Sequence, residues 1–287
     1  MNFIKLIDML DLEKVDQEQF LKPAMRRNLF KKAGDFSLKA ALTSVPFAMV
    51  AMPTIVKAQS SGTTAALSLA LKLEFLERDF YTEGVANINS NALPNTNLAV
   101  FQQILKHETD HVTFLQSALG SAAPVEPTFD FTLGGTYTPF SNYTQFLDFS
   151  QAFEDTGVRA YKGQATNLSG STLTAALQIH SVEARHAAEV RRIRAQVSSV
   201  SGLKGWITGT DNTLPSAFQA VYNAGSPASS YPAEDNTTQG GVNLVNLLNG
   251  SNGEPSVSTA NITEAFDEPL DTATVVAIFS LFCTKNC

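Results

Sequence analysis

The sequence predicts an all-α fold built on a four-helix bundle with one long crossover, followed by an irregular C-terminal extension that ends in a helix. Three observations predict it. Four stretches show helical periodicity, at residues 64–86, 96–119, 143–166 and 172–197. At 1.5 Å per residue each would be about 35–39 Å long, the length scale of a bundle helix. The gaps within each hairpin are short, whereas residues 121–142 are long enough to run the length of the bundle, which predicts an up-down-down-up order.

The N-terminal segment, residues 1–58, is predicted to be a signal. An arginine pair at 26–27 precedes 17 uncharged residues at 40–56, and a small-residue site would allow cleavage after Ala58. These features resemble a twin-arginine export signal, which implies a periplasmic or otherwise exported bacterial protein. The alternative is an N-terminal helix retained on the protein or on a membrane. A stable transmembrane span is not expected, because the run contains two prolines and is shorter than the roughly 20 residues that a bilayer needs.

The remaining segments are expected to form a bundle at 59–200 and an extension at 201–287. The extension is rich in Gly, Ser, Asn, Thr and Pro, with a short helix expected at 216–224 and a last helix at 271–283. Its apolar residues are too sparse for a separate core, so we expect it to pack on the bundle. The only two cysteines, at 283 and 287, can at most close one small terminal loop.

The charge balance limits the kinds of partner that the protein can bind. The formal net charge is -7 and the pI is near 5.1, so the chain offers no electrostatic footprint for nucleic acid. Hydrophobic residues make up 44% of the chain and charged residues 16%, which fits a globular protein rather than a disordered one.

The chemistry-bearing residues lie at regular places on the four helices. Glu-x-x-His occurs twice, in the second and the fourth helix, and a spacing of three lets both side chains of each pair reach one metal centre. The first and third helices each carry a glutamate near the middle, seven residues before a tyrosine. A charged glutamate in an apolar stripe costs several kcal/mol unless it is paired or bound to metal, so four of them indicate a cation site.

This pattern resembles the ferritin-like superfamily, in which a four-helix bundle binds a dinuclear metal centre through carboxylates. The resemblance covers about residues 64–197 and implies two Fe or two Mn ions per chain. It also implies that Glu108 and Glu183 bridge the two ions and that Glu74 and Glu154 each bind one ion. His111 and His186 would each bind one ion as well. Within the superfamily, residues 73–81 and 265–270 look like the bacterial ferritin-like and plant desiccation-related group.

Other polar residues of the four helices have different expected roles. Tyr81 and Tyr161 are the candidate catalytic residues, since a tyrosine near the centre can donate an electron or hydrogen-bond a ligand, although a buried tyrosine can also be plain core. The two remaining histidines, His107 and His180, are expected to be hydrogen-bonded or exposed rather than ligands. A solvated face is expected for four acidic residues, one of which could still orient a histidine ligand: Glu77, Asp79, Glu83 and Asp110.

The functional hypothesis is an exported oxidoreductase that acts in iron oxidation or in the detoxification of O2 or peroxide, the expected small-molecule oxidants. Two alternatives stay open. One is a stress or envelope protein with a structural or vestigial metal site and a partner-binding role, and the other is a manganese catalase. The sequence leaves open whether the protein is a homodimer and whether the metal is Fe or Mn.

Overall fold

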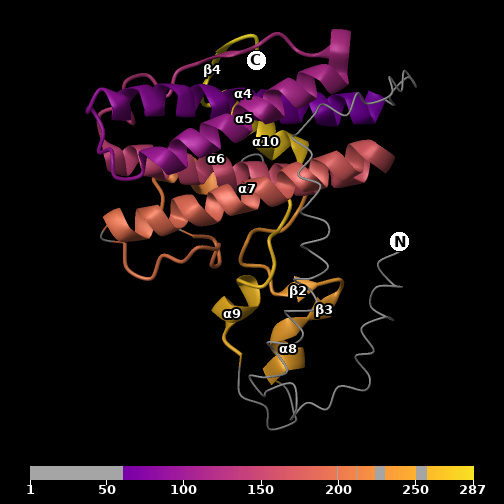
Figure 1. The fold of residues 1–287 in the computed structure, drawn as a ribbon. Helices are drawn as coiled ribbons and strands as arrows, with labels where there is room; N and C mark the ends of the chain where they lie inside the picture. Colours follow the sequence, from indigo (N-terminus) through magenta and orange to yellow (C-terminus); the bar gives the residue numbers. More distant parts are fainter. Residues whose placement is uncertain (1–60, 199, 212, 224–229, 250–256) are drawn as a thin grey trace, which may run out of the picture. The chain divides into compact units, whose positions relative to one another are not determined.

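The computed structural model describes residues 61–287 apart from 199, 212, 224–229 and 250–256 (Figure 1). The predicted N-terminal signal therefore lies outside the described residues. All four predicted long helices are confirmed, with ends within three residues of the expected ones. They are α4 (Ser61–Asn89), α5 (Leu98–Leu119), α6 (Tyr143–Gln164) and α7 (Gly170–Val197). None of the helices in the described ranges is long and apolar enough to cross a membrane.

The shorter elements lie in the crossover, at the end of α6 and in the extension. They are η2 (Gly120–Ala122), β1 (Thr128–Phe129), η3 (Ala165–Asn167), η4 (Ser216–Val221), β2 (Thr238–Gln239), β3 (Val242–Asn243), α8 (Leu244–Asn249), α9 (Thr259–Thr263), α10 (Thr272–Ser280) and β4 (Cys283–Lys285). The helix expected at 216–224 is thus a shorter 3-10 helix.

The long helices pack as two hairpins, α4 with α5 and α6 with α7, and α4 also packs against α6 (Figure 1). Two hydrogen bonds fix the direction of α4 against α6: Tyr81 near the end of α4 bonds Glu154, and Tyr161 near the end of α6 bonds Glu74. Since the later residue of each helix meets the earlier residue of the other, α4 and α6 are antiparallel. These two polar pairs therefore link α4 to α6 in the interior of the bundle.

Local residues explain where the helices start and stop. Gly120 follows α5 with a φ of 54°, a left-handed value that glycine adopts without steric cost, as the sequence predicts. Asn142 precedes α6 and its side chain accepts a hydrogen bond from the backbone N–H of Gln145. Asp271 caps α10 in the same way by accepting from the N–H of Thr274.

The C-terminus differs from the expected helix at 271–283. Helix α10 ends at Ser280, and β4 then pairs antiparallel with β1 of the crossover. A disulfide joins Cys283 to Cys287 and closes the terminal loop. The difference has a physical reason: strand β4 is held by hydrogen bonds to a segment more than 150 residues earlier, and helical periodicity cannot report such a long-range partner.

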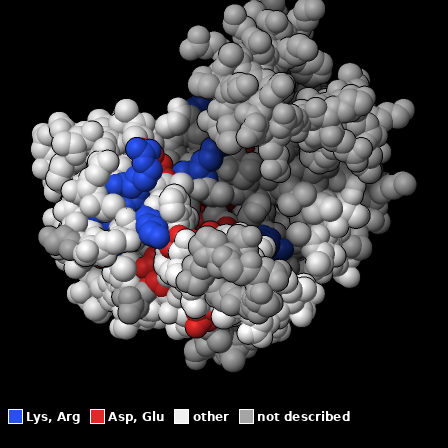
Figure 2. Space-filling model, turned by 90° about the horizontal axis from the view of Figure 1, so that it is seen from below, with Lys and Arg blue, Asp and Glu red and all other residues white. Residues whose placement is uncertain are grey.

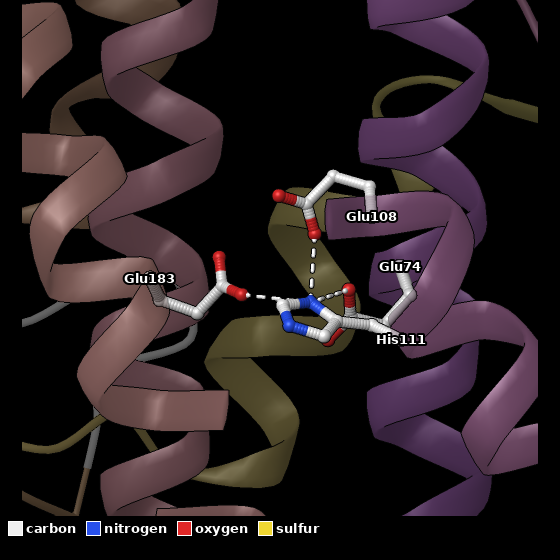
Figure 3. A group of neighbouring side chains, drawn as sticks. All are labelled: Glu74, Glu108, His111 and Glu183. Carbon is white, nitrogen blue, oxygen red and sulfur yellow. Dashed lines mark hydrogen bonds and ion pairs between the residues drawn. The ribbon is translucent and has the colours of Figure 1, made fainter. Parts of the chain in front are cut away.

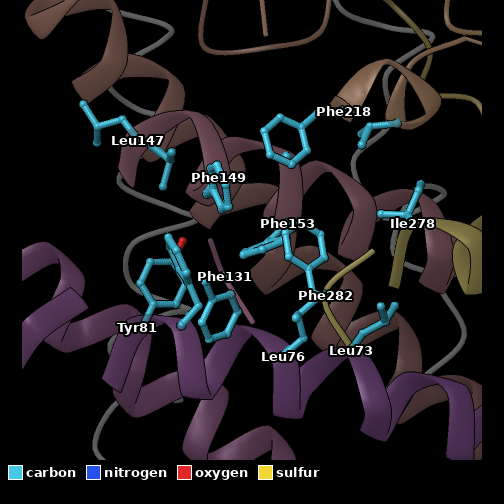
Figure 4. Packing of buried hydrophobic residues seen from close by; sticks show 14 of the residues in the cluster. Leu73, Leu76, Tyr81, Phe131, Leu147, Phe149, Phe153, Phe218, Ile278 and Phe282 are labelled. Carbon is cyan, nitrogen blue, oxygen red and sulfur yellow. The ribbon is translucent and has the colours of Figure 1, made fainter. Parts of the chain in front are cut away.

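An aromatic core joins the bundle to the extension (Figure 4). Phe153 of α6 meets Phe282, just after α10, edge to face with ring centroids 4.9 Å apart, and Phe149 meets Phe218 of η4 at 4.8 Å. Such edge-to-face pairs add about 0.5–1.5 kcal/mol each to the free energy of unfolding beyond the area they bury. The apolar side chains of the extension thus belong to the same core as those of the bundle.

Buried arginines also connect the two parts. The three residues concerned, each at most 1% exposed, are Arg159, Arg191 and Arg194. Arg191 is paired with Asp155 of α6, and its Nη1 lies 2.6 Å from Oδ2 of Asp211 in the extension. A buried guanidinium without such partners would cost several kcal/mol, so the extension stabilises a charge that the bundle alone does not fully neutralise.

The other two arginines follow the same rule. Arg159 Nε lies 2.7 Å from Oε1 of Glu234. Arg194 donates to the backbone oxygen of Thr213 at 2.6 Å and to its hydroxyl at 2.9 Å. Each buried arginine of the bundle therefore has a partner that only the extension supplies.

Exposed charges are paired locally. On the face drawn in Figure 2, some of the described Lys and Arg side chains lie next to Asp and Glu side chains. Examples of such pairs are Lys204 with Glu264 at 2.5 Å and Arg192 with Glu189 at 2.6 Å. Pairs this exposed contribute less than about 1 kcal/mol, so stability comes mainly from the buried contacts.

The contact between α6 and the extension can be tested at Gly163. A Cβ at this position would lie 1.8 Å from the backbone oxygen of Leu270. Replacing glycine by alanine inside a helix normally stabilises it by up to about 1 kcal/mol, but here we expect Gly163→Ala to destabilise the protein by about 1–3 kcal/mol through the clash. Chemical denaturation measures the difference. The control is Gly205→Ala, where the nearest atom would be 3.5 Å away, and equal stability of the two variants would contradict the close packing.

Candidate metal centre

The six predicted ligand residues come together in the interior of the bundle, one from each of α4 and α6 and two from each of α5 and α7. All four glutamates are fully buried, His186 is 5% exposed, and the His111 side chain is 12% exposed. Along α5 and α7 the site interrupts the apolar stripe, with one hydrophobic cluster on each side of it. The site is thus enclosed by apolar packing.

The first half of the site surrounds His111 (Figure 3). Its Nδ1 lies 3.1 Å from Oε2 of Glu74, 3.0 Å from Oε2 of Glu108 and 3.2 Å from Oε1 of Glu183. In Figure 3 the three carboxylates approach the imidazole from three different helices. One nitrogen and three carboxylates therefore converge on one point.

The second half surrounds His186 in the same way. Its Nδ1 lies 2.8 Å from Oε1 of Glu108, 3.3 Å from Oε2 of Glu154 and 4.0 Å from Oε2 of Glu183. Within each half, the candidate ligand atoms all lie within 4.8 Å of one another. Both histidines present Nδ1 to the carboxylates, so the two halves have the same donor set.

Glu108 and Glu183 are shared between the halves. Glu108 directs Oε2 toward His111 and Oε1 toward His186, and Glu183 directs Oε1 toward His111 and Oε2 toward His186. Each of these carboxylates thus offers one oxygen to each half, which is the geometry of a bridging ligand. The two remaining glutamates each face a single histidine.

The two tyrosines hold these terminal carboxylates. The Tyr81 hydroxyl donates to Oε1 of Glu154 at 2.6 Å, and the Tyr161 hydroxyl donates to Oε1 of Glu74. Each hydrogen bond occupies the carboxylate oxygen that faces away from the histidine. Although each tyrosine shares a helix with one glutamate, it bonds the glutamate of the other helix, because α4 and α6 are antiparallel.

The donor atoms fit a pair of metal ions. Five buried atoms of the site make no hydrogen bond of acceptable geometry with the described residues, although some lie close to one another: Glu108 Oε1, Glu154 Oε2, both carboxylate oxygens of Glu183, and His186 Nδ1. Buried polar atoms are almost always satisfied, and orphaned atoms that converge on one point are explained by a cation. Carboxylate oxygens with one imidazole nitrogen per position suit Fe or Mn.

The electrostatics of the cluster show the cost of crowding carboxylates. Burial raises the pKa of Glu108 to about 7, and burial together with the charges of Glu108 and Glu74 raises the pKa of Glu183 well above its usual range. Burial lowers the His186 pKa, but the facing carboxylates outweigh it and raise that pKa to about 11. The folded chain therefore holds extra protons that metal ions would displace.

Glu77 is a correction to the sequence prediction of a solvated face. It is 2% exposed, and burial and the charges of Glu183 and Glu154 raise its pKa well above its ordinary value. A Cβ on Gly157 of α6 would lie 3.1 Å from Oε1 of Glu77 and 3.2 Å from Oε2 of Glu183. Because this glycine has no side chain, there is room for a fifth carboxylate. The only feature of the sequence that pointed to the burial of Glu77 was its position one turn after Glu74.

The other polar residues lie as expected. Glu83 and Asp110 are exposed, and the Asp79 side chain is 32% exposed beside Arg78. His180 contacts the backbone oxygen of Val158 at 3.0 Å. His107 is hydrogen-bonded as well, but to a residue of the site itself, because its Nδ1 lies 2.8 Å from Nε2 of His186.

Comparison with known families agrees with this geometry. Residues 62–196 match the family model of the ferritin-like domain. These residues span α4 to α7, and this part of the chain belongs to the ferritin-like superfamily. No curated protein matches the sequence. The family match does not extend to the desiccation-related group, which stays a prediction.

The pH dependence of the metal-free protein tests the electrostatics. Because the folded-state pKa of Glu108 is about 7 and its ordinary value is 4.5, its contribution to stability is fully present below pH 4.5 and is lost as the pH rises through 7. From Glu108 alone we expect the free energy of unfolding in EDTA to fall by about 2–3 kcal/mol over this interval, in addition to the fall from Glu77 and Glu183, whose pKa values are also raised. Denaturation at several pH values measures it, and Glu108→Gln should reduce the fall by about the Glu108 share. A rise in stability over this interval in the wild type would contradict the assignment.

Glu77 makes a separate prediction. Glu77→Gln keeps the shape of the side chain but removes a carboxyl that the folded protein must keep protonated, so we expect the metal-free variant to gain about 1–3 kcal/mol at pH 8 and little at pH 4.5. Glu83→Gln, at an exposed position of the same helix, serves as the control and should change stability by less than about 0.5 kcal/mol. Equal effects of the two substitutions would place Glu77 outside the charged cluster.

Proposed function

We propose that the protein is a metal-dependent oxidoreductase that binds two Fe or two Mn ions and oxidises Fe(II) or consumes O2 or peroxide. The observation that carries the proposal is the division of the Glu108 and Glu183 oxygens between two histidines in the buried interior. In this arrangement Glu108 and Glu183 would bridge, Glu74 and Glu154 would each hold one ion, and His111 and His186 would each complete one position. Two ions that cycle between +2 and +3 supply the two electrons that reduce O2 or peroxide.

The chain's own residues support this chemistry in three ways. Tyr81 and Tyr161 hold the terminal carboxylates in one orientation and leave one oxygen of each free for the centre. Their proposed role as electron donors rests on the same hydrogen bonds. The apolar clusters exclude bulk water, and the partial exposure of His111 favours a small oxidant over a bulky organic substrate.

We also propose that the protein is exported folded, on the evidence of the arginine pair at 26–27 and the uncharged run that follows it. Loading a buried centre before export agrees with this route, since all four carboxylates are inaccessible in the folded chain.

The test is metal content and Fe(II) oxidation on the purified full chain. We expect about two ions per chain, and the double variant Glu108→Ala, Glu183→Ala should lose both the ions and the oxidation, by more than about 100-fold in rate, since even outer-shell partners of a metal contribute 10–100-fold. The control is Glu83→Ala, Asp110→Ala, which removes exposed carboxylates from α4 and α5.

Two other outcomes would select the alternatives. Bound metal that raises the melting temperature without any turnover of Fe(II) or peroxide would indicate a structural site and a partner-binding role. Rapid release of O2 from peroxide by the Mn-loaded protein would indicate a catalase. Failure to bind any metal after reconstitution would overturn the proposal.

A further inference from the structure

The two halves of the site share the Glu-x-x-His repeat but differ at the residue that precedes it. Glu-x-x-His occurs on α5 and again on α7, and the residues line up pairwise when Glu108 is matched with Glu183. The residue before Glu108 is His107, whereas the residue before Glu183 is Val182. The valine side chain cannot donate or accept a hydrogen bond, so any polar support that His107 gives to one half has no counterpart at this position in the other.

His107 supports the His186 half. Its ring is nearly parallel to the His186 ring, with an interplanar angle of 9° and centroids 5.1 Å apart, and its Nδ1 lies 2.8 Å from Nε2 of His186. Its other nitrogen, Nε2, lies 2.7 Å from the side-chain amide nitrogen of Gln103, one turn earlier on α5. A chain of polar contacts therefore runs from the buried ligand through a half-buried histidine to an exposed glutamine.

A metal ion on Nδ1 would select one tautomer of His186, and His107 can accept the proton of that tautomer. Its Nδ1 faces Glu108 and Glu154, so a metal ion would take the lone pair of that nitrogen. The proton of a neutral imidazole must then sit on Nε2, which donates to Nδ1 of His107. His107 would in turn carry its own proton on Nε2, so the Gln103 amide must turn to present its oxygen in place of the nitrogen that faces this ring. After that turn, one set of proton positions satisfies these contacts and keeps Nδ1 of His186 available for a metal ion.

We propose that His107 is a positioning residue that holds His186 in its metal-ligating tautomer and orientation, so that the two metal positions are unequal and the His186 position binds a divalent ion first. The inference rests on the dinuclear centre proposed above. Partners of this kind typically contribute 10–100-fold to metal affinity. The equivalent residue on α7, Val182, cannot make this contribution to the His111 position.

The test is a titration of the metal-free full chain with Co(II), followed by its visible absorption. The wild type should bind in two steps. His107→Val, which copies the residue at the equivalent place on α7, should weaken the tighter step by about 10–100-fold and alter its spectrum, while the second step stays unchanged. His107→Gln should restore the tighter step, because a carboxamide oxygen can accept from Nε2 of His186. Val182→Ala is the matched control and should leave both steps in place.

Three results would overturn the inference. These are two equal steps in the wild type, identical affinities in the wild type and His107→Val, or a loss of both steps in His107→Val that His107→Gln does not rescue. Absence of any Co(II) binding by the wild type is a different failure, because it would remove the dinuclear centre itself. Two Co(II) per chain with no effect at His107 would leave the centre intact and refute only the positioning role.

Discussion

Burial of several carboxylates in one small volume is the constraint on which the rest of the structure depends. Four glutamates with no exposed surface, and Glu77 with almost none, lie inside an apolar bundle. Without compensation such a cluster would cost far more than the net stability of a typical domain. The groups that compensate for the buried charge are two histidines, two tyrosine hydroxyls, retained protons and the metal ions that we propose.

Contacts elsewhere in the interior of the bundle offset the free-energy cost of these buried carboxylates. Aromatic side chains of the crossover, α6, η4 and the segment after α10 form one core, and the extension supplies partners for three buried arginines. The ion pairs of Arg191 with Asp155 and Asp211 link α7 to α6 and to the extension. The extension therefore acts as a part of the domain that keeps the ligand-bearing helices in register.

The two halves of the site share their donor atoms but differ in their surroundings. Glu77 fills the space over Gly157, and His107 contacts His186, whereas the equivalent residue on α7 is Val182. Inequivalent positions matter for a centre that handles two electrons, because one ion can be held while the other exchanges or reacts. The approximate repeat supplies the ligands, and departures from it distinguish the two positions.

The sequence by itself determined the four helices, the long crossover and the six residues that meet in the interior, because helical periodicity and the Glu-x-x-His spacing are local properties of the chain. Gly120 as a helix end was predictable for the same reason. Only the tertiary structure decided the burial of Glu77, which depends on a glycine of another helix, and the crosswise pairing of the tyrosines, which depends on helix direction. The β1–β4 pair and the arginine partners of the extension also required it, since each joins residues far apart in the chain whose contact no local pattern encodes.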